Sequence, residues 1–268
     1  MRTKTTFTTG IAVAATLALA GTASAATVEQ VDDIGAEPYV DAGEWATDAT
    51  SDGTPVIDDE FGAPDGFGQD SVVLRTPESG DKAATLLNLA EPVDADAITD
   101  ISYHVFRDAD STAADHLTPS IQMIVDFNGG TLEDGGFATM VFEPTYNGYP
   151  VADPIASDEW VFLDAFDDGQ ATWWSTRAVG SVDAYSFVSL QTYLDANPDM
   201  EVLRIGIGQG SGNPGLTAAV DGFTFNDTTY DFEVTAETCK DGGWETAFAE
   251  GTYRNQGQCI ADQVSEAS

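Results

Sequence analysis

The sequence predicts an all-β protein: an antiparallel β-sandwich of the jelly-roll type, with one short helix and a small C-terminal tail that is cross-linked by a disulfide. Apolar and polar residues alternate with a period of two in many short segments, which is typical of half-buried strands. Gly, Pro, Asn and Asp separate these segments, and almost no helical pattern intervenes. About ten strands in this arrangement favour a sandwich.

The clearest expected strands are 98–107 and 120–127. In the second, Ile121, Met123 and Val125 share one face, which predicts that this face lies in the core. The other expected strands are shorter segments of the same character, at 28–31, 44–45, 71–75, 83–89 (ending at Pro92), 137–142, 159–166, 171–174, 202–208, 216–225 and 229–234.

One helix is expected at 186–196, because Phe187, Leu190 and Leu194 recur at helical intervals before Asn197-Pro198. The tail, 235–268, is broken by Gly242-Gly243 and Gly257. Short helical pieces are expected there at 244–248 and 259–264.

The first 25 residues read as a secretion signal. Arg2 and Lys4 precede an apolar run at 10–20, and Ala23-Ser24-Ala25 matches a cleavage site. We therefore expect a secreted, extracellular protein with a β-sandwich domain at 26–234 and a tail at 235–268.

Only two cysteines are present, Cys239 and Cys259. In an exported chain they are expected to pair. Closing a loop of this size stabilises the folded state by roughly 3 kcal/mol. No apolar run after the signal approaches the roughly 20 residues of a transmembrane helix.

The charge of the chain is extreme, at −37. Such a field repels nucleic acid and anionic lipid surfaces, so neither is an expected partner. It suits divalent cations, basic surfaces or neutral ligands such as glycans. Solubility, or adaptation to salty surroundings, is the simpler explanation of the acidity.

Several segments resemble a family of uncharacterised secreted proteins from actinobacteria. They are PSIQMIVDFNGG at 119–130, ATMVFEPTYNG at 138–148, ATWWSTR at 171–177, GIGQGSGNPGLTAAVDGFTF at 206–225 and the tail pattern CKDGGW…F…RNQGQC. The resemblance implies a lamin-G-like or galactose-binding-like β-sandwich. It implies no activity.

Galactose-binding-like sandwiches often hold a structural calcium ion near their first and last strands. Asp221 and Glu233 lie in the matching late-strand region of this sequence. The resemblance thus makes calcium a candidate cofactor with these two residues as metal ligands. The alternative is that they are ordinary solvated acids.

Catalytic signatures are scarce, so whether the protein is an enzyme stays open and a non-catalytic role is favoured. His104 and His116 are the only histidines, and no G-x-S-x-G motif is present. Glu143 and Glu159 flank the aromatic-rich middle and are the carboxylate pair to inspect for glycoside hydrolysis.

Aromatic residues are the strongest lead to a ligand. The candidate ligand-binding residues cluster within residues 142–174 and are Tyr146, Tyr149, Trp160, Trp173 and Trp174. Because adjacent strand residues point to opposite faces, one of the two neighbouring tryptophans should face away from the core. The alternative is that both are buried, one of them under the loop at 146–149.

Three candidate functions are consistent with these observations. The first is a secreted, non-catalytic binding module for extracellular or cell-wall glycan, or another component of the cell envelope. The second is an acidic extracellular interaction or adhesion protein with structural calcium. The third is a polysaccharide-active hydrolase or lyase.

Overall fold

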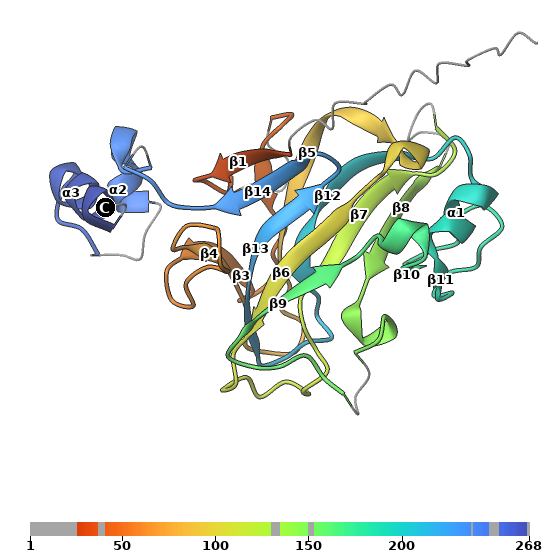
Figure 1. Cartoon of the computed structure of the whole chain (residues 1–268), viewed down its shortest axis with the longest axis horizontal. Coiled ribbons are helices and arrows are strands. Elements are labelled where there is room, and N and C mark those ends of the chain that lie inside the picture. Colours follow the sequence, from red (N-terminus) through yellow and green to blue (C-terminus); the bar gives the residue numbers. More distant parts are fainter. Residues whose placement is uncertain are drawn as a thin grey trace, which may run out of the picture.

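The computed structural model describes residues 26–36, 41–129, 135–149, 153–236, 238–246 and 252–266. The expected signal segment, 1–25, lies outside the described residues. Within them, the strands form two seven-stranded sheets that pack around one main core (Figure 1). The predicted all-β sandwich is therefore confirmed.

Sheet 1 is built around β13, because this long strand pairs with β6 on one side and with both β4 and β14 on the other. Its strands are β1 (Thr27–Val31), β3 (Thr54–Asp58), β4 (Ser71–Thr76), β6 (Ile101–Arg107), β9 (Trp160–Asp164), β13 (Leu216–Phe225) and β14 (Thr228–Phe232). All its pairs are antiparallel except β1 with β14, which run parallel. These two strands lie far apart in the sequence, so no hairpin forces them to be antiparallel.

Sheet 2 has the order β11-β10-β8-β7-β12-β5-β2, and all its pairs are antiparallel. Its strands are β2 (Trp45–Thr47), β5 (Ala83–Asp94), β7 (Ser120–Asp126), β8 (Phe137–Phe142), β10 (Thr172–Ser175), β11 (Val188–Ser189) and β12 (Glu201–Gln209). From β4 to β10 the chain crosses repeatedly between the two sheets, as expected for a jelly-roll arrangement.

Three strands differ from the sequence prediction. β3 and β11 were not expected, and β5 continues through Pro92 to Asp94. The continuation is possible because the pairing of β5 with β12 is irregular between Val202 and Arg204. A proline, which has no N–H to donate, is tolerated beside such an irregularity.

The predicted helix is present but shorter, as α1 (Leu190–Ala196). Val188 and Ser189 instead pair with β10 as the short strand β11. Ser189 then caps the helix, because its Oγ accepts a hydrogen bond from the backbone N–H of Thr192 at 3.3 Å. Strand pairing therefore overrides the helical pattern before residue 190.

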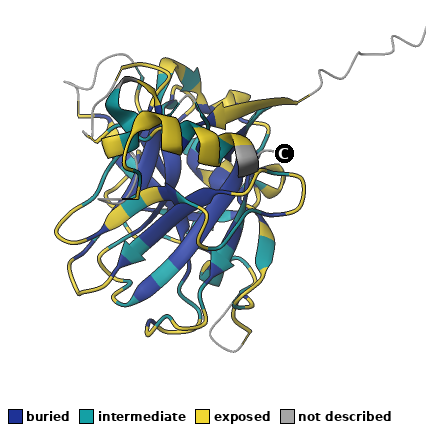
Figure 2. Ribbon diagram, turned by 90° about the vertical axis from the view of Figure 1, so that its left-hand side faces the viewer, coloured by how far each residue is buried: buried dark blue, intermediate teal, exposed yellow. Residues whose placement is uncertain are grey.

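Aromatic side chains join the two sheets at one end of the core. Trp45 of β2 contacts three rings of sheet 1: Phe223, Tyr230 and Phe232, with ring centroids 4.9–5.6 Å apart. All three contacts are edge-to-face, a favourable geometry for aromatic pairs. Figure 2 shows the buried residues concentrated along the central strands and the exposed ones in the loops, the helices and the peripheral strand β1.

Trp173 of β10 joins the sheets at a second point. Its side chain is fully buried, and its ring lies 5.8 Å from that of Phe142 on the neighbouring strand β8. The indole Nε1 donates a hydrogen bond to the backbone oxygen of Ala165, which follows β9 of sheet 1, at 3.0 Å. The indole is thus both a core side chain and a polar link between the sheets.

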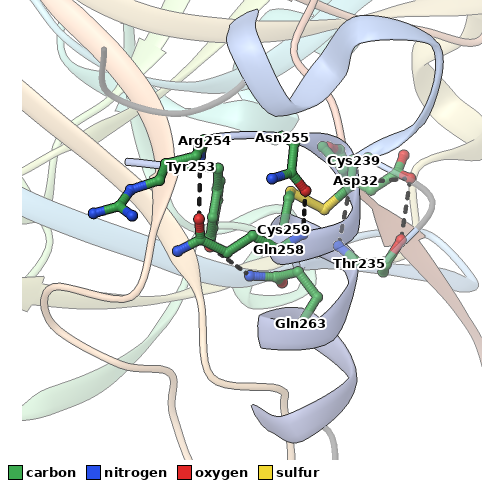
Figure 3. Close-up of a disulfide and its surroundings, with 10 residues drawn as sticks. Asp32, Thr235, Cys239, Tyr253, Arg254, Asn255, Gln258, Cys259 and Gln263 are labelled. Atoms are coloured by element: carbon green, nitrogen blue, oxygen red, sulfur yellow. Dashed lines mark hydrogen bonds between the residues drawn. A yellow bond between two sulfur atoms is a disulfide. The ribbon is translucent and has the colours of Figure 1, made fainter. Parts of the chain in front are cut away.

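The tail lies at the opposite end of the molecule from α1 (Figure 1). It contains α2 (Gly243–Thr246) and α3 (Gln256–Glu266), and the expected disulfide joins Cys239 to Cys259. Where the tail leaves the sandwich, the Thr235 hydroxyl donates a hydrogen bond to the Asp32 carboxylate at 3.5 Å (Figure 3). None of the described helices is both long and apolar enough to span a bilayer.

We expect Trp173→Phe to lower the free energy of unfolding by about 1–3 kcal/mol, because it leaves the buried Ala165 carbonyl without its donor. Thermal or urea unfolding measures the loss. The neighbouring change Trp174→Phe is the control and should cost much less, because Trp174 faces outward. Equal losses in the two variants would contradict this role of Trp173.

Candidate functional site

The outer face of sheet 2 carries a groove of about 780 Å³. Its walls and floor come from the outward-facing residues of four adjacent strands (β10, β8, β7 and β12), from residues that directly follow them, and from Asp48 and Lys82 at the ends of β2 and β5. The lining residues are Asp48, Lys82, Ser120, Gln122, Ile124, Phe137, Thr139, Val141, Glu143, Trp174, Thr176, Leu203, Arg204 and Gly210.

Strand register places these side chains in rows across the sheet. One row runs from Trp174 on β10 to Val141 on β8 and Gln122 on β7. The next runs from Thr139 on β8 to Ile124 on β7 and Arg204 on β12, so it lies two residues away. Because side chains alternate along each strand, both rows face away from the core.

An aromatic wall extends from the groove at Trp174. It consists of Trp174, Tyr146, Tyr185 and Phe187. The Trp174 ring stacks with Tyr185 at 5.6 Å and lies 6.3 Å from Phe187, which in turn lies 4.2 Å from Tyr146. Three of the rings are well exposed: Tyr146 at 49%, Tyr185 at 63% and Phe187 at 46%. Exposed aromatic rings gathered in this way are typical of binding surfaces.

The five aromatic residues singled out from the sequence lie in different places. Trp174 and Tyr146 belong to the aromatic wall. Trp173 is fully buried and offers no surface to a ligand. Tyr149 packs against the core, and Trp160 contacts Phe106 on the outer face of sheet 1, on the other side of the sandwich.

Sequence reasoning missed two members of the aromatic wall. Phe187 was expected on the apolar face of a helix, but the strand pairing of Val188 leaves Phe187 outside the helix and exposed. Tyr185 has a positive φ of 57°, a conformation rare for a bulky residue, in the turn before β11. No periodic signal in the sequence indicates such a turn.

Few charges line the groove. Lys82 and Asp48 form an ion pair with 2.6 Å between Nζ and Oδ2. Burial raises the pKa of Glu143, whereas the Trp174 indole and the nearby charge of His116 partly offset that rise. Trp174 Nε1 makes no well-aligned hydrogen bond, but it lies close enough to the Glu143 carboxylate to favour the charged form.

The two suggested hydrolytic carboxylates lie on different sheets. Glu143 lines the groove, whereas Glu159 directly precedes β9 of sheet 1 and is exposed. Among the described lining residues, the carboxylates are Glu143 and Asp48, and Asp48 is already paired with Lys82. A free pair of facing carboxylates, which glycoside hydrolysis requires, is therefore not formed by these groups.

Asp221, one of the two candidate calcium ligands, is fully buried on β13 of sheet 1, opposite His104 of β6, whose ring contacts Phe67. Its Oδ1 accepts a hydrogen bond from the backbone N–H of Phe232 at 3.0 Å, and its buried Oδ2 has no hydrogen-bond partner. Burial raises the pKa of Asp221 to about 8, and the charges of Asp231 and Glu233 add to the rise.

Glu233 is held by the backbone of residues 69–70. Its Oε2 accepts hydrogen bonds from the backbone N–H groups of Gln69 at 2.7 Å and Asp70 at 3.0 Å. Across the part of the chain that the structure describes, no three His, Cys, Asp or Glu side chains are grouped to hold a metal ion. The cluster thus offers carboxylate oxygens but not a ready-made metal cage.

Comparisons with known proteins add little. No family model matches the sequence, and no curated protein does. Among solved structures, the chain is similar to a Bacteroides thetaiotaomicron VPI-5482 protein to which sugar binding has been ascribed. The two are 17% identical, the alignment covers 76% of this chain and 95% of the other, and the TM-score is 0.36. A similarity of this degree assigns no function to this chain.

The raised pKa of Asp221 has a consequence for stability. A carboxyl group with a folded-state pKa near 8, against an ordinary 3.8, stabilises the fold when protonated and loses this contribution as the pH rises through that range. We therefore expect Asp221→Asn to be more stable than the wild type at about pH 9, by about 1–3 kcal/mol or several degrees in Tm.

The advantage of Asp221→Asn should disappear near pH 4, where the wild-type carboxyl is also neutral. Thermal unfolding as a function of pH measures this, in metal-free buffer. The exposed Asp227→Asn is the control and should shift Tm little at either pH. A variant that is less stable than the wild type across the whole pH range would contradict the prediction.

Proposed function

We propose that this protein is a secreted, non-catalytic binding module that recognises extracellular or cell-wall glycan through the groove on sheet 2. The observation that carries the proposal is the aromatic wall, whose exposed rings are continuous with a groove of about 780 Å³. Aromatic side chains combine a large apolar face with low conformational freedom, which suits stacking against the apolar faces of sugar rings.

The polar lining of the groove supports the same ligand. Gln122, Ser120 and Glu143 contribute amide, hydroxyl and carboxylate groups to the lining of the groove that adjoins the aromatic wall. Sugars present hydroxyl groups around the edge of each ring, so they need polar partners and an apolar platform together. Ligand sites of this kind combine apolar surfaces with a few placed polar groups.

The size and openness of the surface favour a polymer over a single sugar. From β10 to β12 the sheet spans three strand spacings, about 14 Å. The Lys82–Asp48 pair and Arg204 lie toward the far side of this span from Trp174. An extended chain of several sugar units could therefore contact both sides of the groove.

We expect Trp174→Ala to weaken binding to a recognised polysaccharide by about tenfold or more, because it removes the ring that joins the wall to the groove. The measurement is a pull-down of the chain on a panel of insoluble polysaccharides and cell walls, followed by depletion isotherms. Binding should persist at high salt, because stacking is not screened as charge attraction is.

Trp160→Ala is the matched control, since it removes the same side chain from the outer face of the other sheet. It should leave binding unchanged. If the wild type is retained by no polymer, or if both variants bind as the wild type does, the proposed function is wrong.

The alternative function is an acidic interaction or adhesion protein with structural calcium at Asp221 and Glu233. It is supported by the buried Asp221 Oδ2, which lacks a hydrogen-bond partner, and by the repulsion among Asp221, Asp231 and Glu233. A bound cation would relieve that repulsion, as would a proton. Calcium favours such carboxylate oxygens together with backbone carbonyls.

If calcium binds there, millimolar calcium should raise the Tm of the wild type by several degrees and excess EDTA should reverse the shift. Calorimetry should give about one ion per chain. Asp221→Asn should then lose the calcium-dependent increase. If the Tm is unchanged in EDTA and calorimetry detects no heat of calcium binding, calcium does not bind at this site. A proton on Asp221 then relieves the repulsion instead.

A further inference from the structure

One short segment builds the meeting point of the groove and the aromatic wall. It runs from Glu143, at the end of β8, through a single 3₁₀ turn at Pro144–Tyr146 to Asn147. Glu143 lines the groove and Tyr146 belongs to the wall. The carboxylate and the exposed ring are therefore carried three residues apart on one turn.

Asn147 ties this turn to β10, the strand that carries Trp174. Its Nδ2 donates to the backbone oxygens of Glu143 at 3.0 Å and Thr172 at 2.9 Å. Its Oδ1 accepts from the backbone N–H of Thr172 at 2.6 Å. These hydrogen bonds continue the connection to β10 beyond the last paired residue of β8. They thereby fix the position of Glu143 beside Trp174.

The Glu143 carboxylate is partly buried, and the described groups that act on it come from three other elements. These are the Trp174 indole of β10, His116 of the loop after β6, and Tyr103 within β6. Tyr103 is fully buried, and its hydroxyl donates to the backbone oxygen of Pro119 at 3.0 Å. The Tyr103 hydroxyl therefore does not occupy the Glu143 carboxylate, and Glu143 lines the groove.

We propose that Glu143 recognises vicinal hydroxyl groups of a neutral sugar that stacks on the aromatic wall, and that Asn147 is the positioning residue that holds it there. This inference rests on the proposed function. A carboxylate accepts two hydrogen bonds in parallel from neighbouring hydroxyls, which fixes the orientation of the sugar and selects units with two adjacent free hydroxyls.

The same groups disfavour acidic glycans. A uronate or sulfate beside Glu143 would place like charges together in a partly buried site, which costs more than in water. The chain as a whole carries a charge of −37, so a polyanion is also repelled at long range. The ligand class is therefore a neutral polysaccharide whose sugar units keep adjacent hydroxyls free.

The test compares the full chain with E143Q and N147A on neutral polymers (cellulose, xylan, mannan, galactan) and on acidic ones (polygalacturonate, alginate). The wild type should bind at least one neutral polymer and prefer it to the acidic ones. E143Q should weaken that binding about 10- to 100-fold, the range for a charge-assisted hydrogen bond. E159Q removes an exposed carboxylate on sheet 1 and is the matched control.

A pH series separates recognition from mere structure. Wild-type binding should weaken as the pH falls through the raised pKa of Glu143, because protonation removes the charged acceptor. E143Q should bind weakly with a flat profile over that range. N147A should bind weakly but keep the pH dependence, and all variants should melt cooperatively.

Distinct outcomes separate the two proposals. If the wild type binds neutral polymers through Trp174 but E143Q binds equally well, the role of Glu143 is overturned and glycan binding stands. Preference for acidic polymers, or a pH dependence that persists in E143Q, also overturns it. If no polymer is retained, both proposals fail.

Discussion

The alternation of side chains at Trp173-Trp174 is the constraint on which the rest of the structure depends. Two adjacent indoles on one strand must point to opposite faces. Trp173 enters the core and reaches across to the Ala165 carbonyl of the other sheet, whereas Trp174 faces the groove. In this dipeptide, Trp173 links the two sheets and Trp174 connects the groove to the aromatic wall. The stability of the fold and the proposed binding therefore both depend on β10.

The binding surface is assembled from segments that the sandwich holds rather than from a single motif. Tyr146 lies on the turn after β8, and Tyr185 and Phe187 lie between β10 and β11. The register of β10 with both neighbours brings these turns together. A rigid sheet that presents rings from short, tied turns limits the entropy lost when a ligand binds.

The carboxylates of the chain differ in their surroundings. Most of its carboxylates can remain in water and keep the molecule soluble. A few lie on sheet 1, where the backbone N–H groups of Gln69 and Asp70 satisfy Glu233, whereas one buried oxygen of Asp221 has no hydrogen bond. Burial makes that carboxyl a proton-binding group near neutral pH. The opposite sheet instead keeps Glu143 at the groove, where a carboxylate can accept hydrogen bonds from a ligand.

The amino-acid sequence by itself determined the sandwich class, most strands, the pairing of Cys239 with Cys259 and the opposite facing of Trp173 and Trp174, because these depend on local alternation and residue count. It could not determine which tryptophan faces outward, since both are equally apolar. Only the tertiary structure decided that Trp160 lies on the other sheet and that Phe187 lies outside the expected helix. It also decided that Asn147 hydrogen-bonds to Thr172. These depend on pairing between distant strands, which no local pattern encodes.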